Sequence, residues 1–283
     1  MHSEKYIAIV CNRLARSGRA VTLANKISEV LNQKKIIHTL FNGIWPKTFE
    51  GITNIFIVGG DGTLNYFVNQ YPNIQLPLAV FSGGTGNDFH WLLYGKISFE
   101  DQLELVLKAT PRPIDGGRCN DKYFINGVGI GFEGAVAKSL TGKKKLPGKA
   151  SFMAAILKKI FFYRSKTYWI SSNAEQREEQ HFLISVMNGK RAGGGFHIAP
   201  FSNAADGLFE VVLVDKLHPL LRLRWLPIIE KGEHMNLPFV KSIKTKKIII
   251  QSNDIIEAHL DGEYYEADKL EIEILEGRYL FCY

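Results

Sequence analysis

The sequence predicts an N-terminal doubly wound α/β domain with a parallel sheet, followed by a C-terminal antiparallel β-sandwich domain. From residue 5 to about 110, short apolar runs alternate with helical patterns, which is typical of a parallel sheet covered by helices. Thr110-Pro111-Arg112-Pro113 interrupts this alternation and marks a domain boundary. Beyond it, strands separated by Gly, Asn and Asp turns indicate a sandwich.

The predicted elements follow in order along the two domains, residues 1–112 and 113–283. In the first, strands are expected at 6–10, 35–41, 55–58 and 78–81, and helices at 19–32, 64–70 and 99–108. In the second, strands are expected at 123–130, 166–171, 182–187, 208–214, 243–251, 269–275 and 279–281, and helices around 151–163 and 219–230. The last strand is a candidate to return to the first domain.

Composition limits the class of protein. The 283 residues are enough for two domains that each bury a core, and 46% hydrophobic and 22% charged residues are typical of a globular protein. Cys11, Cys119 and Cys282 are far apart in the sequence and show neither metal-ligand spacing nor a disulfide framework. Cys11 falls in a predicted buried strand, where a small core thiol is expected.

The N-terminus and the charge bear on location and partners. The first strand begins at residue 6 and leaves no room for a signal peptide, so a cytoplasmic protein is expected. The most apolar stretch, 152–162, is interrupted by Lys158 and Lys159, so membrane contact is expected to be peripheral, at the inner membrane surface. A net charge of +7 favours an anionic partner, which could be nucleic acid, an acidic bilayer or a phosphorylated metabolite. The sequence leaves the oligomeric state open, and an oligomer is compatible with it.

Two glycine-rich turns follow neighbouring predicted strands. Residues 59–65 read Gly-Gly-Asp-Gly-Thr-Leu-Asn, and residues 82–89 read Ser-Gly-Gly-Thr-Gly-Asn-Asp-Phe. Glycine lets a polyphosphate approach backbone N–H groups that no Cβ shields. Each turn alone is compatible with a tight loop and an Asp helix cap, but two such turns at the carboxyl ends of parallel strands would build one crevice. The pair therefore favours a nucleotide-phosphate site.

The two turns also match the nucleotide-site pattern of a known family. The chain resembles the diacylglycerol kinase catalytic domain in its soluble bacterial lipid-kinase branch, which is related to sphingosine and ceramide kinases and more distantly to NAD kinase. The resemblance extends over nearly the whole chain, although its specific motifs occupy short windows. It implies an α/β nucleotide domain and a β-sandwich domain with the active site in the cleft between them. It also implies transfer of the γ-phosphate of ATP to a lipid hydroxyl, with Mg²⁺ as the metal.

The resemblance implies which residues contact ATP. They are two isolated polar residues, the first glycine turn and one threonine of the second turn: Asn12, Thr39, Gly59, Gly60, Asp61, Gly62, Thr63, Leu64, Asn65 and Thr85. Residues 12–18, Asn-Arg-Leu-Ala-Arg-Ser-Gly, match the family's usual Asn-Pro opening only in part, so Asn12 alone is carried over from them. Thr39, at the end of the second predicted strand, is equally compatible with a strand-end hydroxyl.

Three aspartates in family windows are expected near Mg²⁺. They are Asp61, Asp88 and Asp115, the last within Arg-Pro-Ile-Asp-Gly-Gly at residues 112–117. In the relatives such acids form a network near the phosphates. ATP and water occupy most positions around Mg²⁺, so the protein needs to add only one or two carboxylates. Helix N-capping by Asp61 and Asp88 is compatible with this role, and a turn is an alternative for Asp115.

A second, structural Mg²⁺ site is implied by the windows at 193–200 and 206–211. In the bacterial branch it is held by the Asp of an Asp-Gly-Leu segment, the carbonyl of its Leu and a residue three positions before the Asp. The matching residues here are Asn203, Asp206 and Leu208. Without the resemblance, Asp206-Gly207 would be interpreted as a hairpin turn.

The candidate general base is Glu263, within Leu-Asp-Gly-Glu at residues 260–263. A lipid hydroxyl becomes a good nucleophile when a neighbouring carboxylate accepts its proton, and the family places that proton acceptor at the Glu of such a segment. Asp61 is the rival base, and both could be needed. An exposed Glu beside an Asp-Gly turn is the alternative, and Asp261 could be a helper or only the turn residue.

A basic segment suggests contact with an anionic membrane. Lys143, Lys144, Lys145 and Lys149 precede the mixed apolar and basic residues 152–164, and a lysine cluster beside aromatic residues favours an anionic leaflet. A solvated loop before a helix is an equal alternative. Nucleic acid is not expected as a partner, because the aromatics at 161–163 are contiguous rather than spaced for base stacking.

Other functions remain alternatives to a lipid kinase. NAD kinases share the first glycine turn, but residues 83–88 read Gly-Gly-Thr-Gly-Asn-Asp where an Asn-Glu type ribose-binding pair would be expected. Phosphofructokinases share both turns but lack a β-rich second half. A non-catalytic nucleotide- or lipid-binding regulator is a further alternative, against which the intact Asp61, Asp88 and Glu263 argue.

Overall fold

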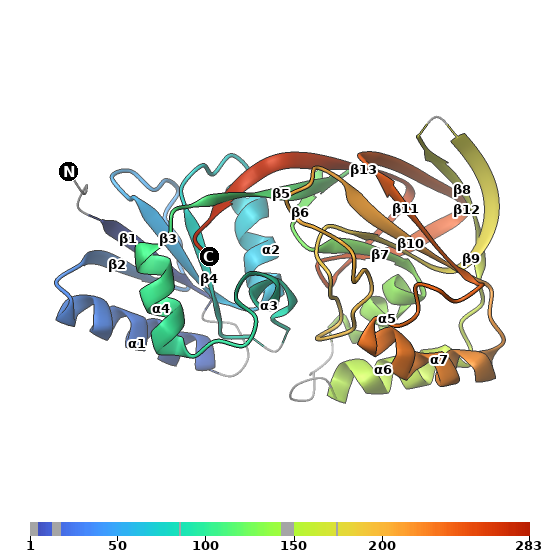
Figure 1. Cartoon of the computed structure of the whole chain (residues 1–283), viewed down its shortest axis with the longest axis horizontal. Helices are drawn as coiled ribbons and strands as arrows, with labels where there is room; N and C mark the ends of the chain where they lie inside the picture. Colours follow the sequence, from blue (N-terminus) through green and yellow to red (C-terminus); the bar gives the residue numbers. More distant parts are fainter. Residues whose placement is uncertain (1–4, 13–17, 85, 143–149, 174) are drawn as a thin grey trace. The chain divides into compact units, whose positions relative to one another are not determined.

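A computed structural model describes residues 5–12, 18–84, 86–142, 150–173 and 175–283. The chain divides into two compact units. Unit 1 comprises the chain up to Ile114 together with Gly277–Tyr283, and unit 2 comprises Asp115–Glu276. Two strands, β5 (Arg112–Cys119) and β13 (Glu263–Phe281), continue from one unit into the other (Figure 1).

Unit 1 contains a parallel sheet. Its strands are β1 (Tyr6–Cys11), β2 (Ile37–Asn42), β3 (Asn54–Gly59) and β4 (Leu78–Ser82). They pair in the order β2-β1-β3-β4, and Phe281 at the end of β13 pairs in parallel with Leu78 of β4. The returning segment 277–283 thus joins the sheet beside β4. Every residue of β3 is buried, as expected for a parallel strand covered on both faces.

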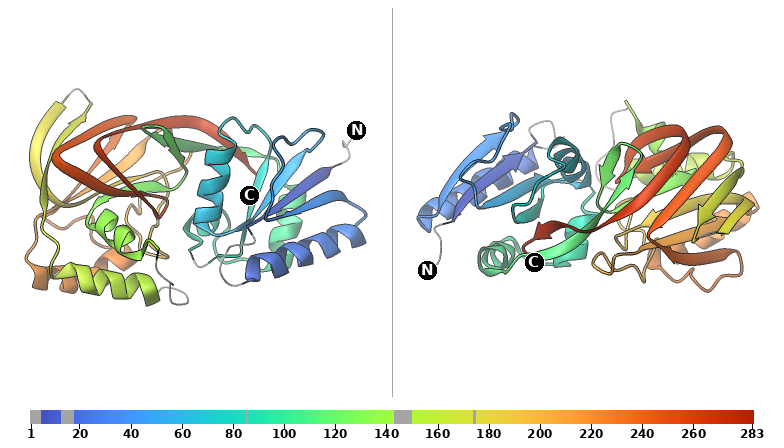
Figure 2. Two further views of the ribbon diagram at one scale, coloured as in Figure 1. Left: turned by 180° about the vertical axis from the view of Figure 1, so that it is seen from behind. Right: turned by 90° about the horizontal axis from the view of Figure 1, so that it is seen from above.

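Helices pack around this sheet. In the described part of unit 1 they are α1 (Arg19–Gln33), α2 (Asp61–Gln70), α3 (Asp88–Tyr94) and α4 (Phe99–Lys108) (Figures 1 and 2). Helices α1 and α4 share a core with alternate strand residues such as Phe56 and Phe81. Helix α2 contacts β3 and places the fully buried Phe67 against Trp45 and Tyr71. This is the α/β architecture that the alternating pattern predicted.

Unit 2 is built from antiparallel strands. Together with β5 and β13 they are β6 (Lys122–Phe124), β7 (Gly127–Gly131), β8 (Lys166–Ser172), β9 (Glu175–Met187), β10 (Phe209–Asp215), β11 (Val240–Thr245) and β12 (Lys247–Leu260). The order is β11-β10-β9-β7-β12-β13, and β8 also lies between β9 and β12, end to end with β7. Strand β6 pairs with β5.

The sheet of unit 2 separates two cores. One face of β9 contributes Ile184 and Val186 to a core shared with β10 and β12. The other face contributes Leu183 and Met187 to a core covered by the helices of this unit, α5 (Phe132–Leu140), α6 (Ala150–Ile160) and α7 (Pro219–Lys231). Residues of one strand point alternately to two sides, so β9 serves both cores.

The structure corrects several predicted elements. The strand predicted at 123–130 is two strands, because the N–H groups of Ile125 and Asn126 between them bond to the Asp261 carboxylate. The strands predicted at 269–275 and 279–281 are parts of β13, and residues 243–251 fall on β11 and β12. Helix α5 was not predicted. It contains Gly134, where a Cβ would lie 2.1 Å from the Glu257 carbonyl oxygen, so close packing explains a residue that usually disfavours helices.

Two further expectations concern individual features of the described residues. Cys11 is fully buried, as predicted, and burial raises the pKa of its thiol to about 11. No helix in the described ranges is both long enough and apolar enough to span a bilayer.

We predict that mild acid destabilises the protein. Burial lowers the native-state pKa of His90 and His234 below the ordinary value of 6.5. At mildly acidic pH these two histidines therefore bind more protons in the unfolded chain than in the native state. The free energy of unfolding should therefore fall as pH drops from about 7.5 to about 5.5, by up to about 1.4 kcal/mol per histidine. Denaturant titrations at both pH values measure it. His234→Gln should reduce this fall, and an unchanged pH dependence in the variant would contradict the assignment.

Candidate functional site

The two predicted glycine turns of unit 1 touch each other through their backbones. The Gly83 N–H donates to the Gly59 carbonyl at 3.0 Å. A Cβ on Gly84 would lie 2.5 Å from the Gly60 Cα, and one on Gly83 would lie 2.9 Å from the Ala20 Cα in α1. Larger residues cannot occupy these positions without moving backbone. The glycines therefore bring the turns after β3 and β4 together at the carboxyl end of the sheet.

Asp61 joins the two turns. It is the first residue of α2, and its N–H donates to the Gly86 carbonyl at 3.2 Å. Its Oδ2 accepts the N–H of Asp88 at 3.0 Å, and its Oδ1 accepts the N–H of Phe89 at 3.1 Å. The carboxylate therefore caps the start of α3 from the neighbouring turn. This interaction places buried Asp88 close to Asp61.

The other residues of unit 1 that were predicted to contact the nucleotide lie in the first turn of α2, directly after β1, or outside the described residues. Thr63 and Leu64 are buried in the first turn of α2, and the Asn65 carbonyl accepts a hydrogen bond from Asn69 at 2.9 Å. Asn12 follows β1 directly, at the same edge of the sheet as the glycine turns. Thr85 lies outside the described residues.

The position predicted for Thr39 was wrong. Strand β2 continues to Asn42, so Thr39 is its third residue and pairs with Ala8 in the middle of the strand, not at its end. Its hydroxyl lies 3.0 Å from the Tyr6 hydroxyl. Asn42, paired with Cys11, is the β2 residue at the edge that carries the glycine turns. The apolar pattern of the strand did not reveal that it included the polar Asn42.

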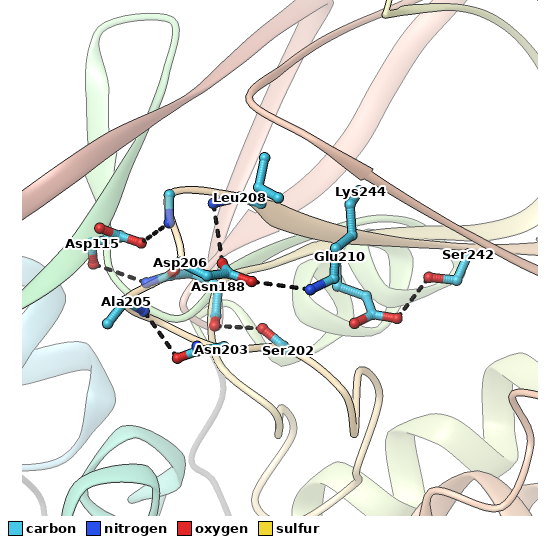
Figure 3. Close-up of polar contacts among 11 residues, drawn as sticks. Asp115, Asn188, Ser202, Asn203, Ala205, Asp206, Leu208, Glu210, Ser242 and Lys244 are labelled. Atoms are coloured by element: carbon cyan, nitrogen blue, oxygen red, sulfur yellow. Dashed lines mark hydrogen bonds and ion pairs between the residues drawn. The ribbon is translucent and has the colours of Figure 1, made fainter.

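In unit 2, Asp115 organises the loop that carries Asp206 (Figure 3). Asp115 is buried at 3% exposure, and its Oδ2 accepts the Gly207 N–H at 2.8 Å. Its own N–H donates to the Ala204 carbonyl at 2.7 Å, and its carbonyl accepts from Asn188 at 2.9 Å. Backbone and side chain of Asp115 thus both hold the predicted metal loop.

The side-chain oxygens of this loop already have donors. Asn203 Oδ1 accepts the Ala205 N–H, and Asp206 Oδ1 accepts the Leu208 N–H, both at 3.2 Å. Asp206 Oδ2 pairs with the Lys244 ammonium at 3.0 Å (Figure 3), and the carboxylate raises the pKa of Lys244. In this arrangement these residues do not fit a divalent cation, because the Lys244 ammonium is bonded to the Asp206 oxygen that the cation would need. Mg²⁺ could bind here only after Lys244 leaves Asp206.

The turn that presents Glu263 is fixed by Asp261. Asp261 and Gly262 have φ of 50° and 90°, the left-handed conformations that the hairpin between β12 and β13 requires. The Asp261 carboxylate accepts the N–H groups of Ile125, Asn126 and Gly127 at 2.8–2.9 Å. Glu263 follows as the first, exposed residue of β13.

A second support of this turn was missed in the sequence. His259 Nδ1 accepts the Gly262 N–H at 3.2 Å, so its ring proton is on Nε2, which lies 3.3 Å from Glu133 Oε2. The buried Ser185 hydroxyl donates to Glu133 Oε1 at 2.8 Å. These three residues come from α5, β9 and β12, far apart in the chain, and no local motif signals them. Of the three, only His259 is close in the sequence to the Asp-Gly-Glu motif at residues 261–263, so that proximity is the one signal that could have identified it.

Metal-ligand side chains do not gather elsewhere in the part of the chain that the structure describes. Within the described ranges, no group of three or more His, Cys, Asp and Glu side chains is arranged to hold a metal ion. A metal ion bound among these described residues would therefore need further oxygen ligands, such as phosphate, water or backbone carbonyls.

Family models match both halves of the chain. Residues 6–119 match the diacylglycerol kinase catalytic domain, and residues 126–277 match the YegS C-terminal NAD kinase beta sandwich-like domain. The chain is 29% identical over 218 residues to the diacylglycerol kinase of Bacillus subtilis, covering 74% of this chain and 71% of the relative. It is 30% identical over 222 residues to a probable YegS-like lipid kinase of Chromohalobacter salexigens, covering 75% and 70%.

Solved structures share the fold. A candidate diacylglycerol kinase of Bacillus anthracis superposes with a TM-score of 0.81 at 23% identity, covering 99% of this chain and 95% of that chain. An NAD kinase of Archaeoglobus fulgidus in complex with ATP has a TM-score of 0.56 at 14% identity, covering 98% and 93%. At such identities the likeness shows the α/β plus β-sandwich fold.

We predict that Lys244 controls Mg²⁺ binding at the Asp206 loop. In the wild type Mg²⁺ must displace the Lys244 ammonium, so the melting temperature measured with Mg²⁺ should differ little from that measured with a chelator. In Lys244→Met the Asp206 charge is released, and the same exchange should raise the melting temperature by about 2–4 °C for each kcal/mol of binding free energy. Lys246→Met, which removes the ion pair with Glu276, is the matched control. Equal responses in all three proteins would count against competition at Asp206.

Proposed function

The chain belongs to the diacylglycerol kinase catalytic-domain family, and we propose that it transfers the γ-phosphate of ATP to the hydroxyl of a lipid alcohol. We place it in the cytoplasm, in peripheral contact with the inner membrane surface. The observation that carries the proposal is the pair of glycine turns in unit 1, packed backbone to backbone and joined by Asp61. A kinase of this kind needs a phosphate cradle, charge neutralisation and a base.

The glycine turns of unit 1 are proposed to bind the ATP phosphates. They end two parallel strands at the carboxyl edge of the sheet, where glycine lets a phosphate come close to the backbone. Asp61 and Asp88 fit Mg²⁺ carried by ATP, because the phosphates leave only one or two positions for carboxylates. When bound, Mg²⁺ neutralises charge on the transferring phosphate. Asn12, Gly62, Thr63 and Asn65 remain proposed contacts of the same nucleotide.

Glu263 is the proposed general base. Both Asp61 oxygens accept peptide N–H groups, whereas the Glu263 side chain is exposed at the end of a turn held by Asp261 and His259. An exposed carboxylate on a rigid turn can accept the proton of an alcohol as it attacks. His259 acts here as a positioning residue, because its Nδ1 fixes the Gly262 N–H next to Glu263.

We expect ATP turnover with lipid alcohols in mixed micelles to require Mg²⁺ and Glu263. Glu263→Gln keeps the size of the side chain but cannot accept the proton, so kcat should fall about 10²–10⁴-fold with little change in the KM for ATP. A panel of diacylglycerol, phosphatidylglycerol, a sphingoid base and a polyprenol identifies the acceptor. The matched control is Glu266→Gln, an exposed acid on the same strand.

The same assay separates the alternative functions. Phosphorylation of NAD without phosphorylation of any lipid would establish an NAD kinase-like activity, for which the fold shared with the Archaeoglobus enzyme gives a reason. ATP binding without turnover on either acceptor would favour a regulator. Either result would overturn the lipid-kinase proposal.

We predict that two substitutions of His259 differ in their effect on kcat. Asn places its Oδ1 near the position of Nδ1 and can still accept the Gly262 N–H, so His259→Asn should keep most of kcat. Gln places its amide near Nε2 and keeps the Glu133 contact but loses the acceptor, so His259→Gln should lower kcat about 10–100-fold through misplacement of Glu263. The KM for ATP should stay constant in both. Equal losses would indicate that His259 only fills space.

A further inference from the structure

Exposed apolar side chains gather where α6 ends and α7 begins in unit 2. Phe161 and Phe162 directly follow α6 and are 43% and 83% exposed. Leu220 and Leu221 in the first turn of α7 are 65% and 42% exposed, and Leu157 of α6 is 45% exposed. We call these five residues the apolar tip. Large apolar side chains exposed together usually mark an interaction site.

A buried arginine holds the two halves of the apolar tip together. Arg222, the residue after Leu221, is 6% exposed, and its Nη1 donates to the carbonyls of Ile160 at 2.7 Å and Tyr163 at 2.8 Å. These carbonyls flank Phe161 and Phe162 in the chain. Figures 1 and 2 show this end of α6 beside the start of α7. The apolar tip is thus a fixed surface made from segments about sixty residues apart in the sequence.

Positive charge surrounds the apolar tip without compensating acids in its segments. Residues 150–173 contain four Lys and Arg and no Asp or Glu, and residues 216–229 contain three Lys and Arg and no acid. Lys158, Arg164, Lys216 and Arg224 are exposed. Within the described ranges, no ion pair joins these four to a carboxylate.

We propose that the apolar tip inserts into the surface of an anionic bilayer. Apolar side chains that stand out from a basic surface fit the boundary between acyl chains and anionic headgroups. A protein partner would instead be expected to offer acids to Lys158 and Arg224 together with an apolar groove. This surface lies on the end of α6 and the start of α7, and it does not depend on the chemistry of the phosphate site. The lysines before α6 that were expected to contact the membrane, Lys143, Lys144, Lys145 and Lys149, lie outside the described residues. Membrane binding and kinase activity can therefore be measured separately.

The test is co-sedimentation of the full chain, without ATP, with vesicles of phosphatidylcholine alone and of phosphatidylcholine mixed with phosphatidylglycerol. The wild type should bind only the anionic vesicles, and salt should weaken binding. Lys158→Gln and Arg224→Gln should each lower the partition coefficient about fivefold. The double substitution Phe162→Ser and Leu220→Ser should lower it by about 10-fold or more. Phe201→Ser, at a side chain that is 66% exposed elsewhere in unit 2, is the matched control and should bind as the wild type does.

Three outcomes would overturn the proposal. The first is that the wild type does not bind anionic vesicles, which is the result expected of a surface that binds an acidic protein. The second is equal binding to both vesicle types. The third is unchanged binding of the double variant. Circular dichroism excludes unfolding as the cause of any loss. Turnover of a water-soluble short-chain lipid alcohol by the double variant should equal that of the wild type. Failure of that turnover in both proteins would reject the proposed function while leaving the membrane result intact.

Discussion

The candidate phosphate site depends on the bond between the Asp61 carboxylate and the start of α3. The four first N–H groups of a helix have no partner within the helix, and Asp61 supplies acceptors for those of Asp88 and Phe89 from another turn. The glycines make this reach possible, since a Cβ on Gly84 would push the turns apart. One carboxylate at the start of α2 therefore links the two turns and holds the start of α3.

In unit 2 a carboxylate also binds backbone N–H groups, at the turn that carries the proposed base. Asp261 accepts three consecutive backbone N–H groups, two between β6 and β7 and one from the first residue of β7. Without this carboxylate these donors would lack acceptors at the break between the strands. The interruption separates two strands that the sequence pattern joined, and it anchors the hairpin on which Glu263 stands. His259, oriented by Glu133, adds a second bond to that hairpin. Rigid support of an exposed carboxylate is what a general base requires.

The sequence predicted the local features well and the long-range ones poorly. The helix expected at 99–108 matches α4, because Ser98 caps it and the Asp101 backbone N–H donates to the Ser98 hydroxyl. Helix α3 has only seven residues and a cap from residue 61, so no local pattern marks it. Lys244 is 38 residues from Asp206, and the family pattern that predicts a metal at Asp206 carries no information about that partner. Pairings of this kind depend on sheet register, which periodicity alone does not give.

The structural use of Asp61 also determines what a substitution there can reveal. Asp61→Asn removes a charge and turns one acceptor into a donor that faces a peptide N–H, so it disturbs α3 and the second glycine turn together. A loss of activity would be expected whether Asp61 binds Mg²⁺, accepts a proton or only caps the helix. Glu263 is exposed and belongs to a turn that Asp261 and His259 hold without its help. A substitution of Glu263 therefore reports on chemistry, whereas Asp61 must be interpreted together with stability and nucleotide affinity.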